Sequence, residues 1–389
     1  MRFLLHINQA SRLRNFKNFS DVFTSKNLPL TIHHLPLKIK HLSFILLFLF
    51  SCKSRESRTV NTAFIHWKSR LELTEFERNY CYELKAKTLY LRLFDVDFNA
   101  SNTFAEPIAE SNFNARDLIS FDKIIPTIFI TNRTLTNIED AKIDSLSTLI
   151  FNKLARNTEG SYFQNKIDDI LIDCDWTRTT KDKYFHLIRQ LKAISNKKIT
   201  ATIRLHQIKF KEKTGIPPAD RGLLMAYNTS DLSDPQTVNS ILNIDVLTTY
   251  ISSNLDNYPL KLDVALPIFS WGILKRDGQA VQLIPNFSKA FLSENKPKNA
   301  AYTEGAYFEN TAEHTIEILK NGYYNGIYLY ADDVIKIEEV SVNDLNSAAD
   351  LLSQHLHNQQ VTISFFSLDS ANLKRYDSSD LLKSVDAFK

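Results

Sequence analysis

Cysteine is scarce in this chain, and its spacing carries no metal-binding motif. Only three cysteines, Cys52, Cys81 and Cys174, occur among 389 residues. Three cysteines cannot supply a disulfide framework for a chain of this length. No two of them form a CxxC pair, and none belongs to a Cys/His cluster with zinc-ligand spacing. The sequence therefore predicts no metal site and no cofactor.

The chain also lacks a strong excess of either charge. It has 47 Lys and Arg against 44 Asp and Glu, a formal net charge of +3, and the basic excess lies largely in the first 60 residues. Nucleic-acid-binding domains concentrate positive charge on one face or element. Since nothing here does so, nucleic acid is not expected as a partner. With 43% hydrophobic residues, the chain is long enough to bury the core of one α/β barrel.

A short apolar run near the N-terminus predicts export. Residues 42–50 are hydrophobic, follow Lys38 and Lys40, and end in Ser51-Cys52. A basic flank before a short apolar stretch is typical of a signal peptide. The apolar stretch is too short to form a membrane-spanning helix. Residues 49–52 resemble a lipobox, in which the cysteine is lipidated and becomes the new N-terminus. The alternative is a buried apolar segment that happens to end in a cysteine.

This interpretation predicts a leader over 1–52, lipidation at Cys52, and a polar tether over 53–60. The protein would then be anchored by lipid to a bacterial membrane in the cell envelope, with the leaflet left open. About 40 residues precede the apolar run, so a start nearer residue 35 would place residues 1–37 outside the protein.

From residue 61 onward, short apolar runs alternate with amphipathic stretches, which is the pattern of β/α units around a parallel sheet. The clearest helical stripe is 184–191, with Thr180 and Asp182 near its start. The fold class predicted is a (β/α)8 TIM barrel over 61–357. We expect an insertion after strand seven over 275–310, with a hairpin turn at Asp277-Gly278, and a C-terminal strand and tail over 358–389. The eight predicted strands are 62–67, 88–94, 124–131, 169–175, 199–205, 222–227, 261–266 and 325–330.

Polar and aromatic side chains follow these strands, and in a TIM barrel the C-terminal strand ends line the active site. On strand four, alternation places Asp173 and Asp175 on one face and Ile170, Ile172 and Cys174 on the other. The apolar face should meet the helices, so both aspartates should point into the barrel mouth. The candidate catalytic residues are Asp95, Asp97, Asp173, Asp175, Arg204 and His206, and the candidate substrate-binding residues are His66, Trp67, Trp176, Tyr227, Asn228 and Trp271.

Arg204 and His206 stand at the end of the adjacent strand, where alternation places them on one face, and they are predicted to partner the two aspartates. A buried carboxylate is costly unless it is paired or hydrogen-bonded. The same residues could therefore form a purely structural ion-pair cluster that closes the top of the barrel.

Three motifs, in order, give the chain a resemblance to the chitinase-like barrels of glycoside hydrolase family 18. They are Asp168 to Thr177 on strand four, Met225-Ala226-Tyr227-Asn228 on strand six, and Leu266 to Gly272 after strand seven. The resemblance implies a glycosidase-like barrel that takes oligosaccharides or polysaccharides, with Asp175 able to orient a sugar N-acetyl group.

The strand-four motif departs from that family at its last position. Thr177 stands where the family has its proton-donating glutamate, and Asp169 and Leu171 also differ from the pattern. A threonine hydroxyl cannot usefully protonate a glycosidic oxygen near neutral pH.

Three functions stay open at this point. The chain is a glycoside hydrolase of altered mechanism, a non-catalytic glycan-binding lipoprotein, or a scaffold protein of the envelope. A carboxylate pair in an open cleft would favour the first, an aromatic groove without such a pair the second, and a closed barrel mouth the third.

Overall fold

The computed structural model describes residues 58–289 and 308–389, apart from the single positions 102, 162, 235, 313 and 325. The predicted leader, the lipidation site Cys52 and nearly all of the tether lie outside these residues, as does much of the predicted insertion. In the part of the chain that is described, no helix is long and apolar enough to cross a membrane.

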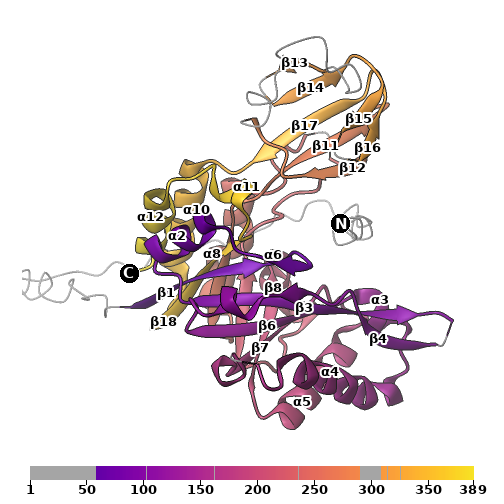
Figure 1. Cartoon of the computed structure of the whole chain (residues 1–389), viewed down its shortest axis with the longest axis vertical. Coiled ribbons are helices and arrows are strands. Elements are labelled where there is room, and N and C mark those ends of the chain that lie inside the picture. Colours follow the sequence, from indigo (N-terminus) through magenta and orange to yellow (C-terminus); the bar gives the residue numbers. More distant parts are fainter. Residues whose placement is uncertain are drawn as a thin grey trace, which may run out of the picture. The chain divides into compact units, whose positions relative to one another are not determined.

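Eight parallel strands close into a barrel (Figure 1). Each strand pairs with its neighbour in parallel, and β1 closes the barrel by pairing with both β3 and β18. The predicted (β/α)8 TIM barrel is therefore confirmed. The barrel strands are β1 (Thr59–His66), β3 (Thr88–Asn99), β6 (Lys123–Ile130), β7 (Asp169–Cys174), β8 (Lys198–Arg204), β9 (Arg221–Met225), β10 (Leu262–Pro267) and β18 (Gln360–Phe366).

The eighth barrel strand is not the one expected. Residues 325–330 were predicted to fill this position, but Ile327–Leu329 forms β16, which pairs antiparallel with β15 (Gly322–Tyr324) outside the barrel. The apolar and exposed positions of β16 alternate, as in a strand with one face in solvent. A barrel strand is covered on both faces and is apolar more continuously, which is the pattern of β18. The barrel strands therefore extend to Phe366.

Helices surround the barrel, and each of the longer ones buries an apolar stripe. On α5 the buried stripe includes Tyr184, Leu187, Ile188 and Leu191, as predicted. Thr74 and Glu77 form a capping box at the start of α2, which satisfies backbone groups that the first turn leaves unpaired. The helices are α2 (Glu75–Glu83), α3 (Asn132–Asn137), α4 (Ile143–Thr158), α5 (Lys181–Ser195), α6 (Leu205–Lys209), α7 (Lys211–Thr214), α8 (Ile244–Asp256), α10 (Val342–His355), α11 (Ser370–Leu373) and α12 (Ser378–Asp386), with short 3-10 turns η2 (Ala115–Leu118), η3 (Asp140–Lys142) and η4 (Gln164–Lys166).

An insertion separates β10 from α10, as predicted, and is larger than 275–310. It has its own core, in which Phe287 packs with Ile316, Ile335 and Leu329. Asp277 and Gly278, both with positive φ, turn the first hairpin. Its strands are β11 (Ser270–Arg276), β12 (Gln279–Pro285), β13 (Phe308–Ala312), β14 (Thr315–Ile318), β15, β16 and β17 (Val334–Glu339).

The barrel interior is filled by alternate side chains of the strands. Ala63, Ile65, Tyr90, Leu171 and Leu223 belong to one buried cluster at its centre. Two short pairings accompany the first strands of the barrel. Strand β4 (Phe104–Ile108) pairs antiparallel with the end of β3, and β2 (Arg70–Leu71) pairs in parallel with β5 (Asn112–Phe113).

Candidate functional site

The strand-four aspartates lie on the predicted face. Leu171, two residues before Asp173, belongs to the interior cluster, so Asp173 shares its face and points into the barrel. Asp173 is almost completely buried and accepts a hydrogen bond of 2.7 Å from the Thr202 hydroxyl on β8. Burial, together with the neighbouring Asp175 carboxylate, raises the pKa of Asp173 to about 7. This side chain can therefore hold a proton near neutral pH.

Asp175 is the more open of the two carboxyl groups. It forms an ion pair with Arg204 at the end of β8, and the exposed fractions of the two side chains are 35% and 14%. The predicted pairing across the neighbouring strands is therefore present. It places one half-exposed carboxyl group beside the buried Asp173.

His206 was predicted to share a strand face with Arg204, and this is wrong. Strand β8 ends at Arg204 and α6 begins at Leu205, so His206 lies on a short helix and is exposed. The surrounding protein atoms and the Arg204 charge lower the pKa of His206 to about 4, although Asp175 acts in the opposite direction. The imidazole is accordingly neutral at pH 7.

A second ion pair lies on β3 and depends on a bulge. The register with β6 shifts between Arg92 and Phe94, and a bulge re-aims the side chains that follow it. Arg92 and Asp95 would otherwise take opposite faces, yet their side chains form a two-bond pair of 2.8 and 2.6 Å. Asp95 is in register with Phe129, and Phe129 with Asp173, so the Asp95 and Asp173 positions are two strands apart in one row.

Asp97 belongs to a different arrangement. It accepts hydrogen bonds from Thr131 (2.7 Å) and Arg133 around the start of α3. Although burial acts in the opposite direction, the bonds from Arg133 and Thr131 hold the pKa of Asp97 below its usual range. These contacts fix the turn between β6 and α3, and both oxygens of the Asp97 carboxylate accept hydrogen bonds in them.

Aromatic rings, half-buried apart from the buried Tyr227, line the rest of the mouth. Trp67, which follows β1, has ring centroids 6.2 Å from Phe129 and 6.0 Å from Phe366. Tyr227, which follows β9, stacks on Phe366 at 5.5 Å, and Phe269 lies edge-on to both at 5.8 and 5.6 Å. Trp67, Phe269 and Phe366 pack on the interior cluster, and Tyr227 belongs to it. The rings form a continuous aromatic arc on strands β6, β1, β18, β9 and the segment after β10.

Phe129 and Phe366 were missed as candidates from the sequence. Phe129 could have been found, since it lies on the same face as Ile125, which belongs to the barrel interior. Phe366 escaped because its strand had not been assigned to the barrel.

Three of the proposed substrate-binding residues do not line the mouth. Trp176 is fully buried on the outer side of β7, where its ring stacks on Tyr184 at 4.8 Å and its indole donates to the Thr214 carbonyl. Trp271 is buried and donates to Glu338 in the insertion. His66 follows Phe64 and faces outward, and burial together with Lys68 lowers its pKa to about 4. Alternation explains Trp176 and His66, because each directly neighbours an inward-facing residue.

Asn228 and Thr177 flank the mouth. Asn228 has a positive φ of 54°, and its Oδ1 is buried without a hydrogen-bond partner among the described residues. Thr177 is exposed, and its hydroxyl lies 2.9 Å from that of Thr179 and 3.2 Å from that of Thr180. The side chain two positions after Asp175 is thus a hydroxyl engaged with other hydroxyls.

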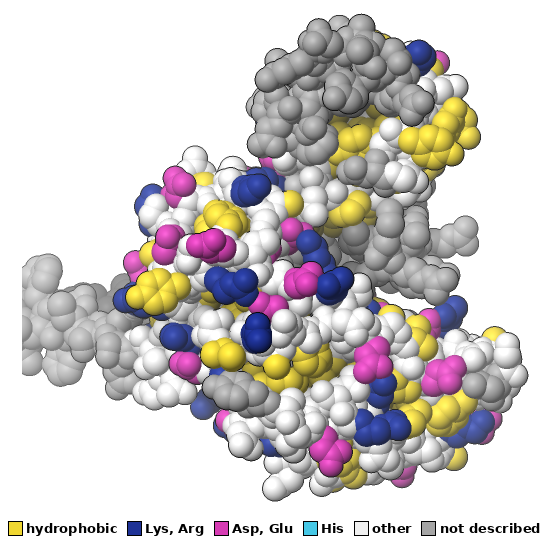
Figure 2. All heavy atoms as spheres, viewed as in Figure 1, with side chains coloured by type: hydrophobic (Ala, Val, Ile, Leu, Met, Phe, Trp, Pro, Cys, Tyr) yellow, Lys and Arg dark blue, Asp and Glu magenta, His cyan; other side chains and the backbone are white. Residues whose placement is uncertain are grey.

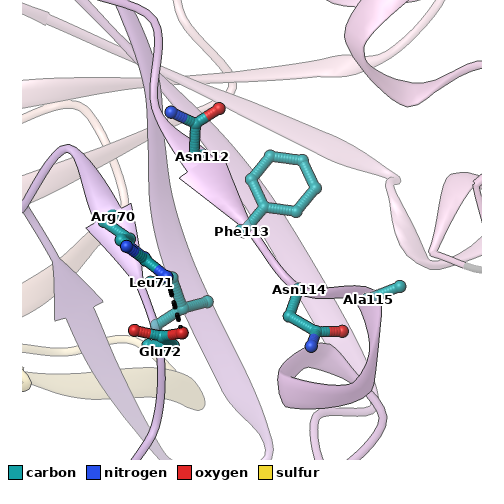
Figure 3. A pocket seen from close by; sticks show the side chains of 7 residues that line it. All are labelled: Arg70, Leu71, Glu72, Asn112, Phe113, Asn114 and Ala115. Atoms are coloured by element: carbon teal, nitrogen blue, oxygen red, sulfur yellow. Dashed lines mark hydrogen bonds and ion pairs between the residues drawn. The ribbon is translucent and has the colours of Figure 1, made fainter.

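A separate depression of about 530 Å³ lies between β2 and β5 (Figure 3). Its charged residues, Arg70 and Glu72, are exposed and paired with each other at 2.8 Å. It contains no predicted site residue. The residues that line it are Arg70, Leu71, Glu72, Asn112, Phe113, Asn114 and Ala115. Across the described ranges, no group of three or more His, Cys, Asp or Glu side chains is arranged to hold a metal ion.

The chain matches no protein-family model and no curated protein. It is similar in structure to several solved enzymes. One is the spore cortex-lytic enzyme SleL of Bacillus cereus, with 14% identity, 86% of this chain and 75% of that chain covered, and a TM-score of 0.49. Another is a chitinase from Chromobacterium violaceum, with 13% identity, 84% and 99% covered, and a TM-score of 0.49. A third is a family GH18 chitinase from Cycas revoluta in complex with (GlcNAc)3, with 14% identity, 85% and 100% covered, and a TM-score of 0.46.

Proposed function

We propose that the barrel mouth binds a glycan chain. The observation that carries this proposal is the division of the mouth into an aromatic arc, formed by Trp67, Phe129, Phe366, Tyr227 and Phe269, and a polar side that contains Asp175, Arg204 and Asp95. A pyranose ring has apolar C–H faces and a rim of hydroxyl groups. Ligand sites of this kind combine apolar walls with a few fixed polar groups.

The polar groups of the mouth suit hydroxyl and amide partners. The half-exposed Asp175 carboxylate keeps acceptor positions open beside its bond to Arg204. Asn228 Oδ1 is a buried acceptor without a partner in the described chain. A bound sugar would satisfy such groups, and an unmet buried acceptor is costly.

Hydrolysis is the second candidate, and the raised pKa of Asp173 is the observation that favours it. Two neighbouring carboxyl groups with different protonation are the usual basis of acid–base chemistry. Asp173, however, lies almost entirely buried below Asp175, and Thr177 carries no carboxyl group. Binding without cleavage is therefore the function that the geometry supports best.

A glycan array followed by product analysis separates the two candidates. The proposal expects saturable binding by the protein and no cleavage of unactivated oligosaccharides. Cleavage limited to activated aryl glycosides would mean that a residual site works without an acid, since a general acid is typically worth about 10²–10⁴-fold in rate. Robust cleavage of unactivated chains would overturn the non-catalytic proposal, and no binding to any glycan would overturn both.

We also propose that the protein is exported and held at a bacterial membrane by lipid on Cys52. The support is the sequence pattern of residues 42–52. Cys52→Ala should abolish palmitate labelling and release the protein from the membrane fraction, whereas Cys81→Ala, at a buried cysteine, should leave labelling unchanged. Persistent labelling of Cys52→Ala would contradict this proposal.

A further inference from the structure

Three tyrosines lie together on the outer face of the β15–β16 hairpin in the insertion. Tyr323 is opposite Tyr328 across the two strands, and Tyr330 follows two residues later on the same side. Their exposed fractions are 66%, 39% and 47%. The centroids of neighbouring rings are 4.9 Å apart at both steps. We call this set the tyrosine surface; a hydrophobic patch is visible on this part of the insertion (Figure 2, upper right).

The hairpin does not need these rings for its own packing. Its inner face carries Ile327 and Leu329, which belong to the buried core of the insertion, with Tyr324 packed against them. Single exposed apolar residues are common and require no explanation, whereas a contiguous exposed cluster marks an interaction site.

An ion pair between Arg276 and Asp333 lies beside the tyrosine surface and holds Tyr330 in position. Arg276 lies over the Tyr330 ring at 4.2 Å. The same guanidinium forms a two-bond pair with Asp333, at 2.8 Å for both bonds, and Asp333 also accepts from the Tyr330 backbone N–H. Tyr330 is therefore held from two sides, and the cation beside it is already matched by a buried carboxylate.

We infer that the tyrosine surface is a second glycan site, which holds a strand of an uncharged polysaccharide apart from the barrel mouth. Charge bears on the class of partner: the guanidinium that lies over these rings, Arg276, is already paired with Asp333 and is not free to bind an anionic polymer or a lipid headgroup. Composition points the same way, because tyrosine presents both an apolar ring and a hydroxyl to its partner. The site lies on a two-stranded hairpin, whose rings cost little conformational entropy to immobilise.

The test is co-sedimentation of the full chain with insoluble chitin, an uncharged polymer of N-acetylglucosamine. Tyr323→Ala/Tyr328→Ala should lower the chitin partition coefficient about tenfold, or about 1.4 kcal/mol, because two aromatic contacts are lost. Tyr323→Phe/Tyr328→Phe keeps the rings and should bind within about threefold of wild type. Tyr82→Ala, which removes an 83% exposed tyrosine from α2 outside the cluster, is the control and should bind as wild type does.

The inference does not depend on the mouth. Tyr323→Ala/Tyr328→Ala leaves every residue of the mouth in place, so the affinity of the mouth for a soluble tetrasaccharide of N-acetylglucosamine should be unchanged in that variant. Equal chitin binding by that variant and wild type would overturn the inference, as would an equal loss in Tyr82→Ala. A mass that doubles with concentration in wild type but not in the alanine variant would also overturn it, and would assign the tyrosine surface to a second copy of the chain.

Discussion

The two ends of the barrel bury similar polar groups in different surroundings. At the N-terminal end, Asp169 accepts from Thr200 and lies 3.5 Å from Lys123, and Asp263 forms a two-bond pair with Arg221. At the C-terminal mouth, Asp173 accepts from Thr202, and Asp175 pairs with Arg204. Each end therefore contains a carboxyl bonded to a threonine and at least one carboxyl bonded to an arginine.

The difference lies in what surrounds these carboxyl groups. Asp263 is closed off by a further bond from the Thr362 backbone N–H, and its side chain is only 6% exposed. Asp175 is open to solvent and lies in the mouth that also contains the half-buried rings of Trp67 and Phe366. Buried acid–base pairs alone do not identify a binding site. At the mouth an open carboxyl group also lies next to half-buried aromatic rings, and the proposed glycan site rests on that combination.

The largest expected effect is a loss of stability on substitution of Asp263 at the N-terminal end of the barrel, which we call the closed end. Asp263→Ala leaves the Arg221 guanidinium without its partner and should lower the free energy of unfolding by about 3–5 kcal/mol. Urea denaturation measures the loss. Glycan affinity of the folded fraction should stay at the wild-type value, and a matching loss of affinity would break the distinction between the two ends.

The next effect concerns the pH dependence of stability at the mouth. The pKa of Asp173 is raised from its usual 3.8 to about 7 in the folded state, so between these values the folded state holds a proton that the unfolded state has lost. Stability should therefore fall as pH rises from 4 to 7, on the order of 2–4 kcal/mol. Asp173→Asn keeps an oxygen acceptor for Thr202 and should remove this fall.

Urea midpoints at pH 5 and pH 8 test that difference. Asp377→Asn, at an exposed helix cap without a side-chain bond, is the control, and its midpoint should change between the two pH values as the wild-type midpoint does. An identical change of midpoint between pH 5 and pH 8 in wild type and Asp173→Asn would show that the Asp173 carboxyl is ionised throughout this range.

A smaller effect separates the two tryptophans that sequence reasoning treated alike. Trp67→Ala should weaken glycan binding about tenfold, or about 1.4 kcal/mol, because it removes the ring that joins Phe129 to the rest of the aromatic arc. Trp176→Phe should destabilise the fold, since the Thr214 carbonyl loses its donor, and should leave binding intact. Calorimetry on both variants checks the assignment, and a binding loss confined to Trp176→Phe would contradict it.

The smallest expected effect is at Asp97. Its partner Arg133 is half exposed, so Asp97→Asn should cost about 1 kcal/mol or less. Because the folded pKa of Asp97 is lowered, its contribution is present above the unfolded pKa and is lost as pH falls below it. Acid titration of wild type and variant, followed by circular dichroism, should converge at low pH. Any change in glycan affinity would return Asp97 to the binding site.

Residue patterns predicted the seven first barrel strands and the inward face of strand four. They succeeded because apolar runs and strict alternation are local properties. The pairing of Arg92 with Asp95 was not predictable, because it follows from a bulge that only the register with β6 reveals. The last barrel strand was misplaced because its identity depends on closure with β1, a contact between the two ends of the barrel sequence. The tyrosines on β15 and β16 were overlooked because that segment had been assigned to the barrel.

The central claim, that the open mouth binds glycan and the closed end does not, is tested most directly by calorimetric titration with the best array ligand. Wild type, Asp175→Asn and Asp263→Asn would be titrated under conditions where all three are folded. The account predicts that Asp175→Asn loses at least about tenfold in affinity, equivalent to about 1.4 kcal/mol, while Asp263→Asn binds as wild type does. Equal affinity in wild type and Asp175→Asn, or a loss in Asp263→Asn alone, would contradict it.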